Sequence, residues 1–192
     1  DEAFAEKYGL TDKFVVGYVG THGLAHSLDQ IVEAAELLSD LKDVRILFAG
    51  GGTAKPDIEK LVKDKQLLNV VLIPRQQKEL MPQLWSLCDI SLISLKDTSL
   101  FKTVIPSKIF ENSAMQIPIL LGVEGESADI IQKYNAGLCF EPENKEDFLT
   151  KLNLLKEDQT VYENCQVGCL RLAKEFDRKK MAEKMRNFLL EI

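Results

Sequence analysis

Short apolar runs alternate along most of the chain with stretches whose apolar residues recur at helical spacing. The runs are rich in Val, Ile and Leu and are separated by turn-forming residues, which is typical of strands. We predict strands at residues 14–19, 44–49, 70–73, 90–95, 118–121 and 137–140. We predict that the intervening helices begin near residue 27 and then cover residues 58–62, 80–87, 108–115 and 128–134.

Strands that are apolar on both faces and separated by amphipathic helices indicate a parallel sheet covered on both sides. With right-handed crossovers this is a doubly wound, Rossmann-like α/β fold. Ligands of such sheets bind beyond the carboxyl ends of the strands. We therefore expect the loops at residues 20–26, 50–53, 74–75 and 94–107 to lie together at the edge where a ligand would bind.

From residue 145 onward the apolar spacing is only helical, and about three helices should close the fold. In the last of them Met181, Met185, Phe188 and Leu189 share one face, which predicts packing in the core. No repeat, low-complexity stretch or proline-rich linker divides the chain. We therefore expect residues 1–192 to form a single domain.

Composition narrows the possible classes of function. The 192 residues are 45% hydrophobic and 28% charged, as in an ordinary soluble protein. A net charge of −6 argues against general nucleic-acid binding, because no basic stripe would neutralise a phosphate backbone. The sequence has no apolar run long enough to span a membrane, and its acidic start does not resemble a signal peptide. The four scattered cysteines should be reduced thiols. We expect a cytoplasmic domain in which any phosphate site is local.

The segment Pro-Ser-Lys-Ile-Phe-Glu at residues 106–111 carries the most specific chemistry. The unpaired amides and positive dipole of a helix start attract phosphate, and Lys108 would add a full charge. If Ser107 is the N-cap, Glu111 lies one turn further on and can accept hydrogen bonds from sugar hydroxyls. The alternative is that Glu111 is a surface carboxylate favoured by the helix dipole. A cation at a helix start is unfavourable without a bound anion, so Lys108 favours a phosphate site.

The loop before the first long helix holds further candidates. Ser27 and Gln30 form a capping-box pattern, which predicts that this helix starts near Ser27. His26 could donate hydrogen bonds to a phosphate or be a plain loop histidine. His22 and His26 are four residues apart, but they fall in a loop without a third ligand, so a metal is disfavoured. The glycines lack the G-x-G-x-x-G order of a nicotinamide site, and Gly20 would instead let a phosphate or sugar approach the backbone.

Four motifs recur here in the order and spacing of a known family. They are GYVGTHGLAHSLD at residues 17–29, AGGG at 49–52, CDISL at 88–92, and the segment 106–111 followed by PILL at 118–121. Over nearly its whole length the chain resembles the C-terminal, donor-binding half of retaining GT-B glycosyltransferases of family 4. The resemblance is greatest to bacterial surface-polysaccharide transferases of the L-fucosamine type.

The resemblance implies roles for particular residues. In that family the glutamate matching Glu111 binds the donor ribose, and the matching helix start binds the diphosphate, which implies Ser107 and Lys108. Main-chain groups of the loop at residues 74–75 would read the base, so Arg75 either lines the base pocket or is a surface charge.

The chain also departs from the family pattern. The family has an arginine directly after Gly20 and a lysine six positions after it, where this chain has Thr21 and His26. The acidic residue eight places before the ribose glutamate is replaced by Thr103. Phosphate charge would then fall on Lys108, with Lys102 as a further candidate, and on helix amides.

The resemblance implies a glycosyltransferase domain that binds a nucleotide sugar, either UDP- or GDP-linked, and needs no cofactor or metal. It would transfer a hexose or an N-acetylated deoxyhexosamine to a glycan or a lipid-linked acceptor at the inner face of the cell membrane. An N-terminal acceptor domain would be absent, so we expect a fragment of a longer enzyme that is inactive alone. A noncatalytic, nucleotide-binding regulatory module is the main alternative, and a dehydrogenase is a weaker one.

Overall fold

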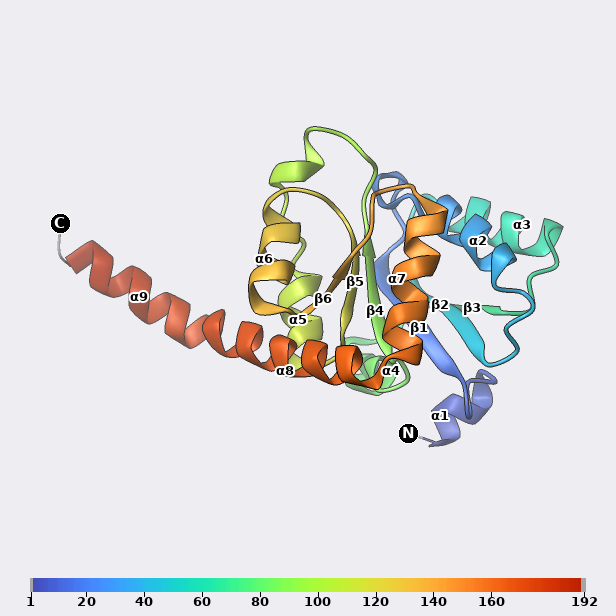
Figure 1. The fold of residues 1–192 in the computed structure, drawn as a ribbon, viewed down its shortest axis with the longest axis horizontal. Helices are drawn as coiled ribbons and strands as arrows, with labels where there is room; N and C mark the ends of the chain where they lie inside the picture. The colour runs from blue at the N-terminus through green and yellow to red at the C-terminus, as the bar shows by residue number, and fades with distance from the viewer. Residues whose placement is uncertain (1, 191–192) are drawn as a thin grey trace.

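The computed structural model describes residues 2–190 and shows a twisted parallel sheet with helices on both faces (Figure 1). Six strands form the sheet: β1 Phe14–Thr21, β2 Val44–Gly51, β3 Val70–Pro74, β4 Ile90–Ser94, β5 Ile119–Gly122 and β6 Gly137–Cys139. Their order is β3-β2-β1-β4-β5-β6, and every neighbouring pair is parallel. The predicted doubly wound Rossmann-like fold and its six strands are confirmed.

Helices and short 3-10 turns connect and flank the strands. The helices are α1 Glu2–Lys7, α2 Leu28–Leu37, α3 Lys55–Asp64, α4 Met81–Trp85, α5 Lys108–Ala114, α6 Glu126–Tyr134, α7 Lys145–Glu157, α8 Gln159–Glu175 and α9 Arg178–Leu190. The 3-10 turns are η1 Leu24–His26, η2 Lys78–Leu80 and η3 Phe101–Thr103. The helix predicted at residues 80–87 is therefore shorter than expected and follows a 3-10 turn.

The core lies on both faces of the sheet because alternate side chains of each strand point to opposite sides. On one face Val16 and Tyr18 of β1 pack with Leu28 of α2 and Phe148 of α7. On the other face Val15 and Val19 pack in a cluster with α4, while β4, β5, α5, α6 and α8 form a third cluster. This double burial explains why the strands are continuous apolar runs.

The first long helix starts where the sequence predicts, but not for the predicted reason. Ser27 has a left-handed backbone with φ of 46° and makes no capping hydrogen bond to the helix. Its hydroxyl instead donates to Glu143 Oε1 at 2.8 Å. The capping-box interpretation is therefore wrong, because the Ser27 side chain is turned toward the segment before α7.

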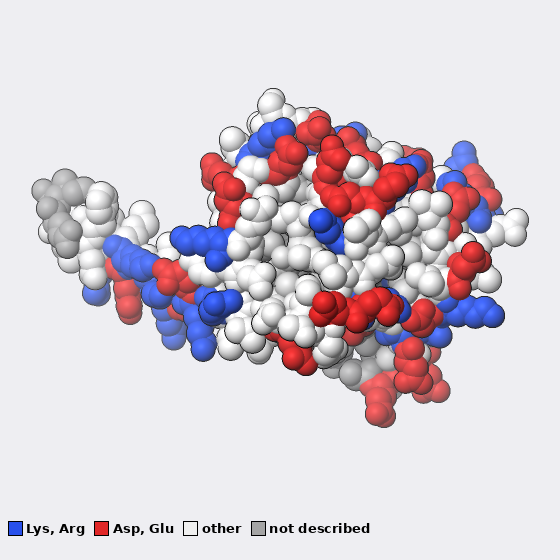
Figure 2. Space-filling view, in the orientation of Figure 1, with Lys and Arg blue, Asp and Glu red and all other residues white. Residues whose placement is uncertain are grey.

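The last helix contradicts the predicted core packing. Met181, Met185, Phe188 and Leu189 are 40%, 66%, 64% and 59% exposed, and α9 has no buried residue among those described. Figure 1 shows α9 continuing from α8 beyond the body of the sheet. Figure 2 shows Lys and Arg side chains along the same helix. Its apolar spacing is real, but only Met181, at its start, lines a groove with α5, and Met185, Phe188 and Leu189 remain exposed.

Among the described residues, no helix is both long enough and apolar enough to cross a bilayer. Cys88, Cys165 and Cys169 are buried and Cys139 is half-buried, and all four are free thiols as predicted.

Candidate functional site

The loops that follow the carboxyl ends of the strands gather at one edge of the sheet. The strand order reverses between β1 and β4, because the chain moves outward from β1 through β2 to β3 and then returns to β4 on the other side. This reversal is the topological switch point at which doubly wound folds bind ligands. A backbone hydrogen bond from Lys96 N to Ala25 O at 2.9 Å joins the loops after β4 and β1 there.

Backbone hydrogen bonds join two glycine loops at this edge. Gly20 and Gly50 are register partners on β1 and β2, with φ of 143° and 145°. A side chain at Gly50 would overlap the carbonyl oxygen of Gly20, so glycine is required there. Beyond them, His22 N donates to Gly51 O and Ala54 N donates to His22 O, both at 2.9 Å. The loops after β1 and β2 therefore form a single backbone surface.

Lys108 reaches this surface from the first turn of α5. Its ammonium nitrogen lies 3.9 Å from the centroid of the Tyr18 ring, and its Cε lies 2.7 Å from the position that a Gly20 Cβ would occupy. Burial lowers the pKa of Lys108 to about 8, and the neighbouring Glu111 opposes that shift. No carboxylate lies within ion-pair distance of Lys108 among the described residues. Such an unpaired, largely buried cation is costly unless an anion binds beside it.

His26 joins Lys108 and Gly20 at the switch point, as the sequence predicts. Its Nδ1 lies 3.3 Å from the carbonyl oxygen of Ser94, and its ring lies 5.6 Å from the Tyr18 ring. Burial lowers the pKa of His26, repulsion from Lys108 adds to this, and the Ser94 contact opposes it. Because a carbonyl only accepts, Nδ1 carries the proton of the neutral ring. Nε2 can then donate to a phosphate only after His26 gains a second proton.

His22 is a member of this site whose role the sequence did not indicate. Its ring is fully buried 5.8 Å from the Tyr18 ring and 6.3 Å from the Phe48 ring. Neither ring nitrogen has a hydrogen-bond partner within the described residues. Burial and the charges of Lys55 and Lys108 together lower the pKa of His22 to about 4, and the Ala49 backbone opposes this shift. The sequence offers for His22 itself only its four-residue offset from His26, which is a metal-like pattern and does not indicate this buried position.

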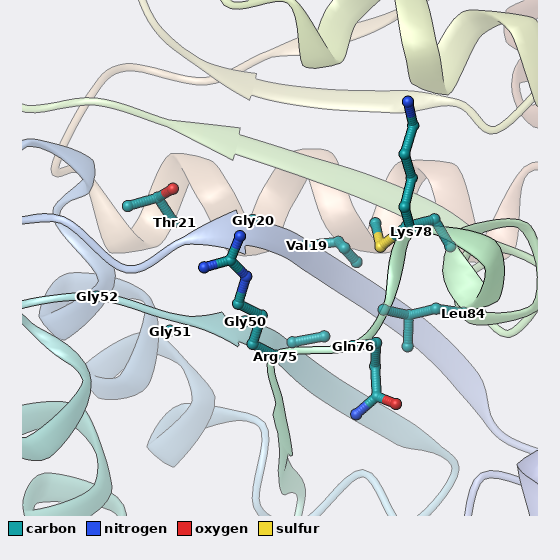
Figure 3. Close-up of a pocket in the computed structure, with 12 residues that line it drawn as sticks. Val19, Gly20, Thr21, Gly50, Gly51, Gly52, Arg75, Gln76, Lys78 and Leu84 are labelled. Carbon is teal, nitrogen blue, oxygen red and sulfur yellow. The ribbon is translucent and has the colours of Figure 1, made fainter.

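A cavity of about 730 Å³ extends from the two glycine loops toward the end of β3. Its lining includes Gly20, Thr21, Gly50, Gly51, Gly52, Arg75, Gln76, Lys78, Met81 and Leu84. Figure 3 shows the Arg75 side chain extending across this cavity toward the Gly20 end of β1. Arg75 is also exposed, so it is compatible with both the base-pocket and the surface-charge interpretations.

Ser107 and Glu111 do not line this cavity. Both line a second groove, of about 440 Å³, together with Phe110, Phe176 and residues at the start of α9. Ser107 has a right-handed helical backbone and makes no side-chain cap, so the predicted N-cap geometry is not formed. Glu111 is exposed on the first turn of α5, close enough to Lys108 to influence its pKa.

Two further candidates lie on the loop between β4 and α5. Thr103 is exposed in η3, and its hydroxyl donates to Leu100 O at 3.1 Å. Lys102 forms an ion pair with Glu124 at 2.5 Å and lies 3.9 Å from Asp97. These contacts point Lys102 toward the loop after β5, which makes it a poor phosphate ligand. Over residues 2–190, no three His, Cys, Asp or Glu side chains are arranged to hold a metal ion.

The fold is a doubly wound α/β domain of the Rossmann type, and Lys108 and His26 lie at its switch point. Residues 1–167 match the family described as Glycosyl transferases group 1, and the chain belongs to that family.

Individual relatives agree with this family. The chain is 26% identical over 182 residues to the sulfoquinovosyl transferase SQD2 of Arabidopsis thaliana, covering 93% of this chain and 34% of that protein. It is 27% identical over 169 residues to the Escherichia coli glycosyl transferase WcaI, which is named for colanic acid biosynthesis. That match covers 83% of this chain and 40% of WcaI. The crystal structure of Anabaena Alr3699/HepE in complex with UDP superposes on this chain with a TM-score of 0.85 at 14% sequence identity. The superposition covers 100% of this chain and 52% of that protein. The chain therefore spans between about a third and about half the length of these proteins.

Proposed function

We propose that this chain is the C-terminal, donor-binding domain of a retaining GT-B glycosyltransferase. The full enzyme would move a hexose or an N-acetylated deoxyhexosamine from a nucleoside diphosphate to a glycan or lipid-linked acceptor during surface-polysaccharide synthesis. UDP is the proposed nucleotide, with GDP as the alternative. The observation that carries this proposal is the unpaired Lys108 ammonium beside Gly20 at the switch point.

The proposed chemistry is electrostatic. When the bond between the anomeric carbon and the β-phosphate oxygen breaks, its electron pair goes to the departing diphosphate. Lys108, the backbone around Gly20 and a protonated His26 would stabilise that growing negative charge, because they are fixed in place before the reaction. The cavity that contains Arg75 would take the base, and Glu111 would accept hydrogen bonds from the ribose hydroxyls. No cofactor or metal enters this scheme.

The family membership and the colanic acid name of one relative support a polysaccharide role, of which the L-fucosamine type is the narrowest version proposed here. The partners we propose are an N-terminal acceptor domain of the same enzyme and a lipid-linked acceptor at the cytoplasmic face of the membrane. For this role, the full-length gene should encode an upstream domain of similar size.

Calorimetric titration with UDP, GDP, UDP-sugars and NAD tests the proposal. We expect one nucleoside diphosphate and its sugar conjugates to bind, and preferential binding of NAD would overturn the transferase assignment. A module that binds free nucleotide but no nucleotide sugar would favour the regulatory alternative.

The ribose assignment has its own variant. Glu111→Ala should weaken UDP binding by about tenfold, or about 1.4 kcal/mol, and leave pyrophosphate binding nearly unchanged. Glu126→Ala, which removes an exposed carboxylate from the first turn of α6, is the matched control. Equal losses for UDP and pyrophosphate would remove Glu111 from the ribose site.

A further inference from the structure

Two lysines approach the paired glycines from different helices. Lys108 of α5 lies against Gly20 at the end of β1. Lys55, the first residue of α3, donates from its Nζ to the carbonyl oxygen of Gly50 at 3.1 Å. Because Gly20 and Gly50 are register partners on neighbouring strands, both ammonium groups lie beside one short stretch of paired backbone.

The carboxylate contact of Lys55 is weak. Glu59 lies 3.7 Å from Lys55 Nζ, one helical turn further along α3, and its side chain is 51% exposed. Exposed ion pairs of this kind contribute little to stability. The Lys55 side chain is only 21% exposed, so its charge is held near the glycine loops rather than in open solvent.

His22 lies near both lysines, and its state agrees with this concentration of charge. The ring is fully buried with no hydrogen-bond partner among the described residues, and both ammonium groups disfavour its protonation. A neutral histidine adds no positive charge, and the carboxylates that act on the two lysines, Glu59 on Lys55 and Glu111 on Lys108, are both exposed. Positive charge held with only exposed counter-charges is the arrangement expected of a site that binds an anionic ligand.

We propose that Lys55 is a second cation of the donor site, which with Lys108 holds the diphosphate across the paired glycines Gly20 and Gly50. This inference rests on the proposed function. It also accounts for the missing cations of the loop after β1, where Thr21 and His26 stand in place of the arginine and lysine that the resemblance implies. The charge is supplied instead from the first residue of α3.

Lys55→Met keeps the length of the side chain and removes the charge, and Lys60→Met makes the same change at an exposed position of α3. Both variants are titrated with pyrophosphate, UDP and uridine at low and physiological salt. We expect Lys55→Met to weaken the binding of pyrophosphate and of UDP about tenfold at low salt and to leave the affinity for uridine unchanged. The salt dependence of pyrophosphate and UDP binding should become smaller. Lys60→Met should change each affinity less than twofold.

A merely structural role would give a different result. If Lys55 only holds the Gly50 carbonyl in place, the binding of uridine would weaken together with that of UDP, and that outcome overturns the inference. A loss no greater than that of Lys60→Met also overturns it. If Lys55→Met fails to fold, Lys55→Arg and Lys55→Gln test the inference in its place. The UDP affinity of the arginine variant should stay within about twofold of the parent, and that of the glutamine variant should fall by more than this.

The two proposals fail in distinguishable ways. If the parent protein binds pyrophosphate through Lys55 but binds no nucleotide or nucleotide sugar, the donor function fails and the anion site stands. If the parent binds UDP and Lys55→Met does so equally well, the donor function stands and the role of Lys55 is wrong.

Discussion

The ammonium nitrogen of Lys108 lies 3.9 Å from the centroid of the Tyr18 ring, and the Tyr18 hydroxyl donates to Thr21 O at 2.7 Å. One aromatic ring thus supports the cation on its face and anchors the start of the glycine loop with its hydroxyl. A cation over an aromatic face is attracted by the ring quadrupole, most strongly where water is excluded. Tyr18 is fully buried, so it fixes where the charge of Lys108 is presented.

The lowered pKa of Lys108 predicts a pH-dependent stability. The folded pKa is about 8 against an ordinary value of 10.5, so between these values the unfolded chain binds the extra proton and the folded chain does not. The free energy of unfolding should therefore rise with pH across this window because of Lys108. Below pH 8 the buried charge is a cost, so Lys108→Met should keep or raise the Tm at pH 7.

Thermal unfolding of the parent and Lys108→Met from pH 7 to pH 10.5 checks this prediction, because the difference between them cancels the other groups that titrate. The difference should shift in favour of the parent as the pH rises. A pH-independent difference would show that Lys108 is not desolvated.

The contact between the two glycine loops predicts that alanine destabilises the protein at Gly50 but not at the neighbouring Gly51. Gly50→Ala should lower the free energy of unfolding by about 1–3 kcal/mol, because the left-handed backbone is strained for alanine and its methyl group meets Gly20 O. Gly51→Ala is the control, because a Cβ there meets no atom within 4 Å, and its effect should stay within about 0.5 kcal/mol. Urea unfolding measures both, and equal effects would contradict the close approach of the strands.

The exposed face of α9 predicts that its large apolar residues contribute little to the stability of this chain. Phe188→Ser should change the free energy of unfolding by no more than about 0.5 kcal/mol. Phe148→Ala, at a buried position on α7, should cost about 3–5 kcal/mol. Chemical denaturation of the two variants tests this, and a large loss for Phe188→Ser would mean that α9 is covered in solution.

The strands were predictable because each is buried on both faces, and continuous apolar runs therefore mark them in the sequence. The gathering of Gly20, His26 and Lys108 was also predictable, because the carboxyl ends of parallel strands must share one edge. That Glu111 lines a groove between α5 and the end of α8 and not the cavity that contains Arg75 was not predictable, since it depends on how α5 packs against α8.

Periodicity alone determined the fold class of this chain, since local patterns record which side of a strand or helix avoids water. It could not tell whether an apolar face would meet a partner, and so α9 was placed in the core although its side chains are exposed. Nor could it pair Lys55 with Lys108, which are more than fifty positions apart in the chain. Only the alignment of β1 with β2, and the approach of α3 and α5 to their ends, brings these charges to one place, because electrostatic contact depends on distance in space.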